Sequence, residues 1–134
     1  MNTFHLDIVT PDGEAFSGEV ESLLIRTDGG DTEILAGHAD YVAPVGTGRA
    51  RIRMGGVSRF ASASHGIITV VGGDVKLAAV TFEFAEDIDV ERAKRAKEAA
   101  EEKIRVAKDD RALMLARAKL ERAIARIRAS ELKM

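Results

Sequence analysis

The sequence contains no cysteine, no tryptophan and a single tyrosine among its 134 residues. Without cysteine, neither a disulfide framework nor thiol chemistry is available to the chain. Aromatic residues make up only 4% of the sequence, so a core must be built from Val, Ile, Leu, Ala and five Phe. Apolar runs such as Ile67–Val71 are far too short to span a bilayer, and no secretory signal precedes them. We therefore expect a protein that is kept in the cytoplasm, without direct membrane insertion.

The formal net charge is only −2, but the two signs are unevenly distributed along the chain. Residues 1–86 carry 6 basic and 12 acidic side chains, whereas residues 87–134 carry 14 basic and 10 acidic ones. The acidic first part argues against nucleic acid as a partner. The basic second part suits an acidic protein surface, a phosphate ligand or an anionic membrane. The two parts are expected to have different partners.

Residues 1–84 are predicted to form an antiparallel β-sandwich. Phe4, Leu6 and Ile8 alternate with polar residues, as they do on a half-buried strand. The segment Thr10–Gly13 is a turn sequence, and glycine pairs separate several later β-rich runs. Helices do not alternate with the strands, which excludes a doubly wound fold. The further strand candidates are Val20–Thr27, Val45–Met54, Val57–Ala63, Ile67–Val71 and Val75–Thr81.

Residues 85–134 are predicted to form an antiparallel two-helix hairpin, which makes the fold α+β. From Asp89 onward the chain has no Gly and no Pro, and good helix formers dominate. Asp89 is a predicted N-cap for a helix that runs to about Lys108. Asp109-Asp110 is the predicted break, where one Asp can cap the second helix, which continues to about Ala129. The predicted apolar face of the second helix consists of Leu113, Ala116, Leu120, Ala123, Ile124 and Ile127.

Folding the hairpin about Asp109 brings arginines together at its open end. Arg92 lies 17 residues before that position and Arg126 lies 17 residues after it, while Arg122 and Arg126 are i,i+4 neighbours. Like charges repel, so such a cluster favours an anion, and guanidinium groups suit phosphate oxygens. A solvated basic helix face is the competing interpretation, because neighbouring carboxylates are available to neutralise these groups.

The sequence predicts no catalytic centre and no metal site. None of its three histidines has a second histidine at a metal-ligand spacing, and no phosphate-loop motif is present. His38 and Asp40 are interpreted as structural, since a general base also needs a placed substrate and partner groups.

Three motifs in this order resemble the epsilon subunit of bacterial F-type ATP synthases. They are Ile8–Gly13 at the start of the β-region, Gly37-His38-Ala39 in a loop, and Ile88–Ala93 at the head of the hairpin. The last one is similar to the ATP-binding motif of epsilon subunits from bacilli. The loop departs from the usual pattern, because Ala36 stands where the family has proline.

The resemblance implies particular site residues. A nucleotide site is implied at Glu83, Ile88, Asp89, Arg92, Ala93, Arg122 and Arg126. A rotor-contact loop is implied at Glu33, Gly37 and His38, and an inhibitory basic helix at Arg117, Lys119, Arg122, Arg126 and Arg128.

The resemblance also implies a non-catalytic regulator in the central stalk of the synthase. Its β-domain would contact the gamma subunit and the c-subunit ring, and its extended hairpin would reach the alpha and beta subunits and inhibit ATP hydrolysis. The packed-down hairpin would bind ATP, with Mg²⁺ as a possible phosphate ligand. The chain would then lie on the cytoplasmic face of the bacterial membrane, peripheral within the complex. Three alternatives stay open: a stalk adaptor that regulates by charge alone, a small enzyme on a β-scaffold, and a membrane-surface helix protein.

Overall fold

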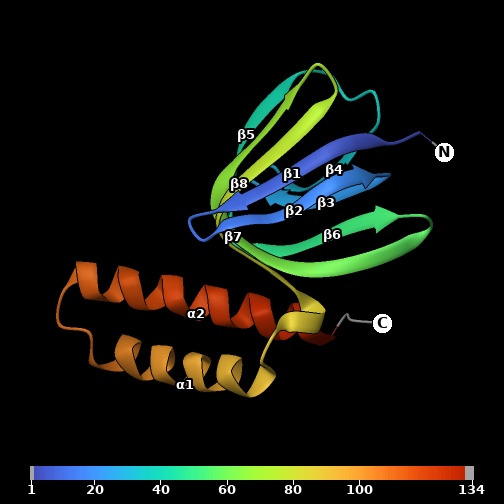
Figure 1. Ribbon diagram of the computed structural model, residues 1–134. Helices are drawn as coiled ribbons and strands as arrows, with labels where there is room; N and C mark the ends of the chain where they lie inside the picture. Colours follow the sequence, from blue (N-terminus) through green and yellow to red (C-terminus); the bar gives the residue numbers. More distant parts are fainter. Residues whose placement is uncertain (1, 132–134) are drawn as a thin grey trace.

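The computed structural model describes residues 2–131, in which eight strands are followed by two long helices (Figure 1). The α+β architecture predicted from the sequence is confirmed. The strands are β1 (Phe4–Thr10), β2 (Gly13–Val20), β3 (Ser22–Thr27), β4 (Gly30–Leu35), β5 (Tyr41–Val45), β6 (Gly48–Met54), β7 (Val57–Val71) and β8 (Asp74–Phe84). A short 3₁₀ turn, Ala85–Asp87, leads to α1 (Val90–Val106) and α2 (Asp110–Glu131).

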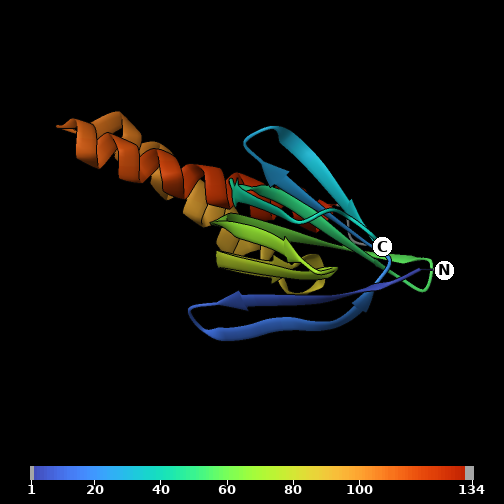
Figure 2. The ribbon, with the colours of Figure 1, turned by 90° about the horizontal axis from the view of Figure 1, so that it is seen from above.

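The strands join in one hydrogen-bonded path that folds over itself into two layers (Figure 2). The order is β2-β1-β8-β7-β5-β3-β4, and β6 bridges β3 and β7. All pairs are antiparallel except β1 with β8, which run parallel. Between the layers lies a core of Leu, Ile, Val and Ala side chains that includes Leu6, Ile25, Ile52 and Leu77, each at most 1% exposed.

Strand β7 belongs to both layers because it bends near its middle. Its first half pairs with β6 and its second half pairs with β5, while β8 follows it along both halves. At the bend, His65 has φ +42° and is not paired with β8, although its neighbours Ser64 and Gly66 are. The sequence analysis separated Val57–Ala63 from Ile67–Val71, but the structure forms one continuous strand through this bend, with the same register to β8 on both sides.

Four further strands differ from the sequence analysis. It missed β2 and β4, and it merged the end of β5 with β6 into one run, Val45–Met54. β2 and β4 were missed because they are exposed: they end the sheet path, and many of their side chains face solvent. Their apolar residues therefore alternate too weakly to be recognised from periodicity alone.

The helical hairpin has the predicted caps and nearly the predicted bounds. The Asp89 carboxylate accepts the backbone N–H of Arg92 at 3.1 Å, and the Asp109 carboxylate accepts that of Ala112 at 2.7 Å. These bonds satisfy amide groups that have no partner within their own helices. The chain between Val106 and Asp110 is too short for any arrangement other than antiparallel helices.

Alanines close the hairpin, and α2 lies between α1 and the β-sandwich (Figure 1). The buried helix residues include Ala93, Ala100, Ala116 and Ala123. The second half of α2 packs on β6 and β7, while the closed end of the hairpin projects away from the sandwich (Figure 2). Alanine buries little apolar area, so each contact stabilises this element only modestly.

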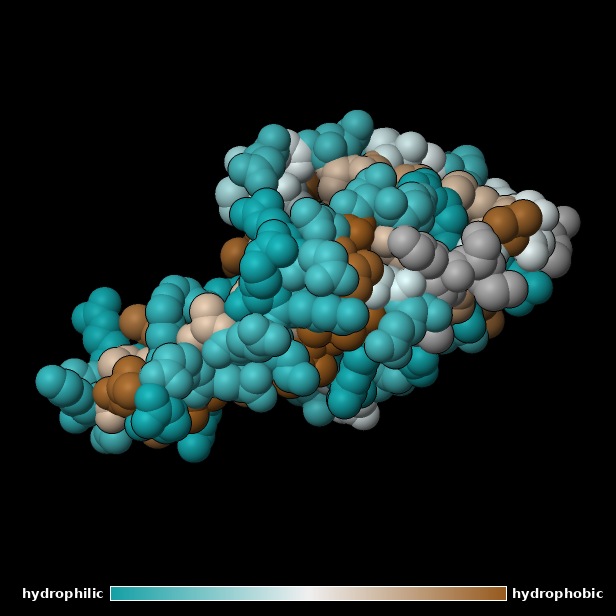
Figure 3. Space-filling model, turned by 90° about the horizontal axis from the view of Figure 1, so that it is seen from below, coloured by the Kyte–Doolittle hydropathy of each residue, from teal (hydrophilic) through white to brown (hydrophobic). Residues whose placement is uncertain are grey.

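The projecting part of the hairpin is covered mostly by polar side chains, with apolar surface near its closed end (Figure 3). The exposed apolar residues there are Val106, Met114 and Leu115. Within residues 2–131, neither helix is long and apolar enough to cross a membrane.

A polar cluster on the outer surface of β1 and β2 makes stability depend on pH. His5 Nε2 lies 3.0 Å from Asp7 Oδ1, and His5 Nδ1 lies 3.2 Å from Glu19 Oε2. The hydrogen bond to Asp7 is the main cause that raises the pKa of His5 above its usual 6.5. A raised pKa in the folded chain means that protonated His5 stabilises the fold below pH 6.5 and that this contribution is lost as pH rises through the folded value.

Replacing His5 with glutamine is therefore expected to flatten the pH dependence of stability. The wild-type chain should lose more unfolding free energy than the variant between pH 6 and pH 8. Urea unfolding at both pH values measures this difference. Equal losses in the two proteins would contradict the stabilising role of protonated His5.

Candidate functional site

A depression of about 350 Å³ lies where the end of β8, the 3₁₀ turn and the open end of the hairpin meet. Its walls come from the continuous stretch 83–96 and from Arg126 of α2. The side chains that line it are Glu83, Asp87, Asp89, Arg92, Ala93, Ala96 and Arg126. The equal-arm argument from the sequence placed Arg92 and Arg126 at the same end of the hairpin, and both line this depression.

Arg126 connects the hairpin to the β-sandwich. Its Nε donates to Glu83 Oε1 at 3.2 Å, and the two side chains are 31% and 38% exposed. Partial burial strengthens such a contact relative to an ion pair in open solvent. Glu83 is near the end of β8, so this bond fixes the position of α2 against the sheet.

The head of α1 supplies the other wall. Asp89 caps the helix through the Arg92 backbone, which places the Arg92 side chain one turn into α1. Ala93 follows it and is 3% exposed, so a larger residue there would fill the space between the helices. The head of a helix also carries free N–H groups and a positive dipole end, which favour a negatively charged ligand.

Two residues of the expected nucleotide set lie outside this depression. Ile88 is 6% exposed and packs into the core, and its backbone N–H donates to Ala85 O at 3.2 Å. Arg122 lines a neighbouring hollow instead of this one. The sequence analysis did not predict Asp87 as a site residue. Asp87 ends the 3₁₀ turn, two residues before the Asp89 cap, and lines the depression.

The neighbouring hollow, about 210 Å³, shares Ala96 and Arg126 with the first one. Its remaining lining residues are Ala99, Ala100, Lys103, Lys119 and Arg122. The two hollows differ in charge. The first holds three carboxylates and two guanidiniums, whereas the second holds four cationic side chains and no carboxylate.

The expected rotor-contact residues lie on or beside the β4–β5 connection. Glu33 is within β4 and is paired with Arg51 of β6. Gly37 has φ +82°, a conformation that glycine adopts without strain. His38 Nδ1 donates to its neighbour's carbonyl, Ala39 O, at 2.7 Å, and its ring meets Tyr41 edge to face at 5.4 Å. The turn is therefore ordered despite the missing proline.

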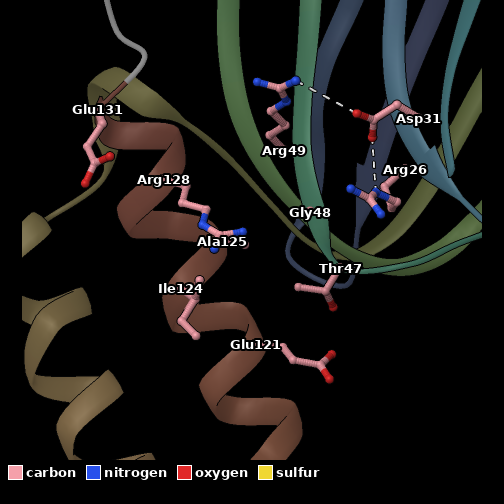
Figure 4. A pocket seen from close by; sticks show the side chains of 10 residues that line it. All are labelled: Arg26, Asp31, Thr47, Gly48, Arg49, Glu121, Ile124, Ala125, Arg128 and Glu131. Atoms are coloured by element: carbon pink, nitrogen blue, oxygen red, sulfur yellow. Dashed lines mark hydrogen bonds and ion pairs between the residues drawn. The ribbon is translucent and has the colours of Figure 1, made fainter.

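A larger hollow of about 740 Å³ opens on the other side of α2, toward the ends of the strands (Figure 4). Arg128 of the expected basic helix lines it, and Arg117 is exposed elsewhere on α2. On the strand wall, Arg26 and Arg49 both reach Asp31, at 3.1 and 3.9 Å (Figure 4). This pairing partly neutralises the wall, and no residue of the expected nucleotide set lines this hollow.

In the part of the chain that the structure describes, no group of three or more His, Cys, Asp or Glu side chains is placed to hold a metal ion.

Comparison with known families identifies the two parts of the chain. Residues 3–85 match the family described as the ATP synthase delta/epsilon chain, β-sandwich domain, and residues 86–131 match its long α-helix domain.

Individual relatives agree with this assignment. The ATP synthase epsilon chain of Bacillus velezensis is 37% identical over 127 residues, which cover 95% of this chain and 96% of the relative. The epsilon chain of Halalkalibacterium halodurans is 37% identical over 110 residues, with 82% and 83% covered.

Solved structures give the same fold. A chain in the Euglena gracilis mitochondrial ATP synthase, a structure of its OSCP, F1 and c-ring, matches with a TM-score of 0.81 and 25% identity, covering 96% of this chain and 81% of that one. A chain from the Tetrahymena thermophila central stalk and c-ring matches in fold alone, with a TM-score of 0.65 and 13% identity.

Proposed function

The chain belongs to the delta/epsilon family of ATP synthase chains and is an epsilon subunit of the central stalk, and from this premise we propose that its hairpin is an ATP-sensitive regulator of the motor. In this proposal residues 85–134 form the regulatory element and residues 1–84 form the stalk-binding body. The packed-down hairpin binds ATP and permits rotation. The released hairpin extends and inhibits ATP hydrolysis.

The observation that carries the proposal is the meeting of Arg92, Arg126 and Asp89 in one depression at the open end of the hairpin. Both helices and the end of β8 contribute to this depression, so a ligand there contacts every element that must stay together in the packed-down state. A ligand at about 100 times its Kd stabilises the binding state by about 2.7 kcal/mol. That amount is enough to shift a hairpin held largely by alanine contacts.

The charges of the site suggest how ATP would lie. Phosphates avoid carboxylates, so the phosphate chain would extend toward Arg126 and Arg122, away from Asp87. Asp89 and Glu83 would face the sugar and base, whose hydroxyl and amino groups donate hydrogen bonds. Ile88 would pack beneath the site. Its backbone N–H already donates to Ala85 O, so that group would not bind the ligand. Mg²⁺, where present, would be held by phosphate oxygens.

The proposed partners follow the division of charge. The β-sandwich contacts the gamma subunit and the c-ring, with Glu33, Gly37 and His38 at the ring contact. The basic α2, including Arg117, Lys119 and Arg128, reaches acidic surfaces of the alpha and beta subunits when the hairpin is extended. The subunit would be non-catalytic and would lie on the cytoplasmic face of the bacterial membrane as a peripheral part of the complex.

Calorimetric titration of the isolated chain with ATP tests the nucleotide site. We expect saturable heat at submillimolar to millimolar ATP and a higher midpoint of thermal unfolding in its presence, because the ligand binds only the folded hairpin. A β-domain truncated after Phe84 is the matched control, and it should give no heat. No heat from the full chain at millimolar ATP would favour the alternative, a stalk adaptor that regulates by its basic helix alone.

A further inference from the structure

The 3₁₀ turn that links the β-sandwich to the hairpin (Figure 1) is held by an arginine of the sandwich. Arg59 of β7 donates to Glu86 Oε1 through both Nε, at 3.0 Å, and Nη2. Its Cζ also lies 3.6 Å from the centre of the Phe84 ring, at the end of β8. The planar guanidinium therefore covers the last residue of the strand and binds the turn at the same time.

This contact continues the pairing of β7 with β8 beyond the end of the backbone ladder. The pairing ends at Ala61 and Phe84, so position 86 falls opposite position 59 in the same register. The chain leaves the sheet at Ala85, where the 3₁₀ turn begins. The side chains of Arg59 and Glu86 thus join two segments whose backbones have stopped pairing.

The surroundings favour this contact over a typical surface ion pair. The Arg59 side chain is 34% exposed, and Phe84 beneath it is only 8% exposed. The Phe84 ring is fixed in turn by edge-to-face contacts with Phe82 and Phe16, at 5.2 and 6.2 Å. A partly buried guanidinium over a fixed ring has less side-chain freedom left to lose than two solvated side chains have.

The turn held in this way carries two of the carboxylates that line the nucleotide depression. Ala85 is fully buried, and its carbonyl accepts the Ile88 N–H at 3.2 Å, which closes the turn. Asp87 lines the depression, and Asp89 both lines it and caps α1. Asp89 follows Glu86 by three residues, so their Cα atoms are at most about 11 Å apart. A shift of the turn would move both carboxylates and the head of α1.

We propose that Arg59 is a positioning residue for the hairpin, which holds the 3₁₀ turn on the sandwich and so keeps Asp87 and Asp89 in place in the nucleotide depression. Arg59 lines neither this depression nor the two other hollows beside α2, so it would not contact the ligand itself. The inference rests on the proposed function for its ligand. The hold on the turn, however, is a property of the chain without nucleotide.

Hydrogen exchange of the full-length chain without nucleotide measures the hold on the turn. In Arg59→Gln we expect the amides of residues 85–100 to exchange about three- to tenfold faster, as for one lost charge-assisted contact. Amides of β3 should change less than twofold, because β3 pairs with neither β7 nor β8. Arg59→Lys keeps the charge without the planar fork and should give an intermediate rate.

Arg53→Gln on β6 is the matched control. Arg53 is exposed, lines none of the three hollows, and forms no ion pair within residues 2–131. Its exchange rates should match those of the wild type. Adding Glu86→Gln to Arg59→Gln should accelerate exchange no further, because both substitutions remove the same contact.

Calorimetric titration with ATP measures the consequence for the site. We expect Arg59→Gln to bind ATP about three- to tenfold more weakly, although Arg59 lies outside the depression. Arg59→Lys should recover part of this loss, and Arg53→Gln should stay within twofold of the wild type.

Two exchange results would overturn the positioning role of Arg59. One is an unchanged rate at the turn, and the other is an equal acceleration at the turn and in β3, which indicates a general loss of stability. An unchanged ATP affinity in a variant with a loosened turn would overturn it as well. A wild-type chain that binds no ATP would contradict the nucleotide sensor, whereas faster exchange at the turn in Arg59→Gln would still support the hold of Arg59 on the hairpin.

Discussion

Replacing Gly66 with alanine is expected to destabilise the chain by about 3 kcal/mol or more, the range of severe overpacking. A Cβ built on Gly66 would lie 2.0 Å from Ala78 O and 2.8 Å from Ala79 Cα, both in the backbone of β8. Backbone atoms of a paired central strand have no alternative rotamer, so β7 and β8 must separate. Thermal unfolding should show a midpoint about 10 °C lower or more.

The constraint at Gly66 is one of space, because its φ angle is outside the left-handed region. Gly66 follows the bend at His65, where β7 leaves β6 and joins β5, and at this point β7 lies close against the backbone of β8. A change there disturbs both layers of the sandwich. It also disturbs the surface of β7 on which α2 rests, so the variant should hold the hairpin less firmly as well.

Gly46→Ala is the matched control for this substitution. The nearest atom to its added Cβ would be Arg26 Cγ at 3.8 Å, an ordinary contact, and the backbone N–H of residue 46 keeps its bond to Arg26 O. Alanine at such a position stabilises by up to about 1 kcal/mol through the unfolded chain. A Gly66→Ala midpoint within 2 °C of the wild type would mean that the backbone at the bend has room to adjust.

The helical part of this fold was more accessible to sequence reasoning than the β-part. Both hairpin caps, Asp89 and Asp109, act within three residues of their own position, so local sequence is sufficient to place them. Strand pairing depends on partners that are distant in sequence, and the parallel contact of β1 with β8 joins the two ends of the sandwich. No local sequence signal specifies that pairing. Local sequence also gives no clear signal for the exposed strands β2 and β4.

In the candidate site, too, some contacts could be predicted from local sequence and others could not. Arg92 and Arg126 could be brought together by counting along two arms of equal length, because α-helices have a fixed rise. The same count did not predict the position of Lys103. Folding about Asp109 places Lys103 opposite residue 115, whereas in the structure it lines one hollow with Lys119. The contact between Arg126 and Glu83 needed the path of β8, which the sequence does not specify.

Replacing Arg126 with alanine is expected to weaken ATP binding by about 10- to 100-fold, the largest loss for any single residue of the site. Arg126 lines both hollows and is the residue through which α2 is bonded to the end of β8. Its loss would remove a phosphate ligand and would leave the Glu83 carboxylate in the site without its ion-pair partner. Calorimetric titration with ATP measures the effect, and co-purification with the gamma subunit checks that stalk assembly is unchanged.

Arg126→Lys separates charge from geometry. A lysine keeps the positive charge but loses the planar fork that binds a carboxylate or a phosphate through two donors. We expect its ATP affinity to lie between those of the wild type and Arg126→Ala. Arg95→Ala is the control on α1, because Arg95 lines neither hollow, and its affinity should stay within twofold of the wild type.

The assembled complex distinguishes the nucleotide sensor from regulation by charge alone. If only the basic character of α2 mattered, Arg117→Ala and Arg126→Ala would reduce inhibition of ATP hydrolysis by the same amount, because each removes one positive charge. If α2 contributes to a nucleotide site, the two variants should differ in how their inhibition depends on ATP concentration. Arg117 is exposed and lines neither hollow, so its variant should keep the dependence of inhibition on ATP concentration, whereas Arg126→Ala should inhibit at ATP concentrations that relieve the wild type. Identical ATP dependence in the two variants would assign the regulation to charge and leave the depression at the open end of the hairpin without a role in it.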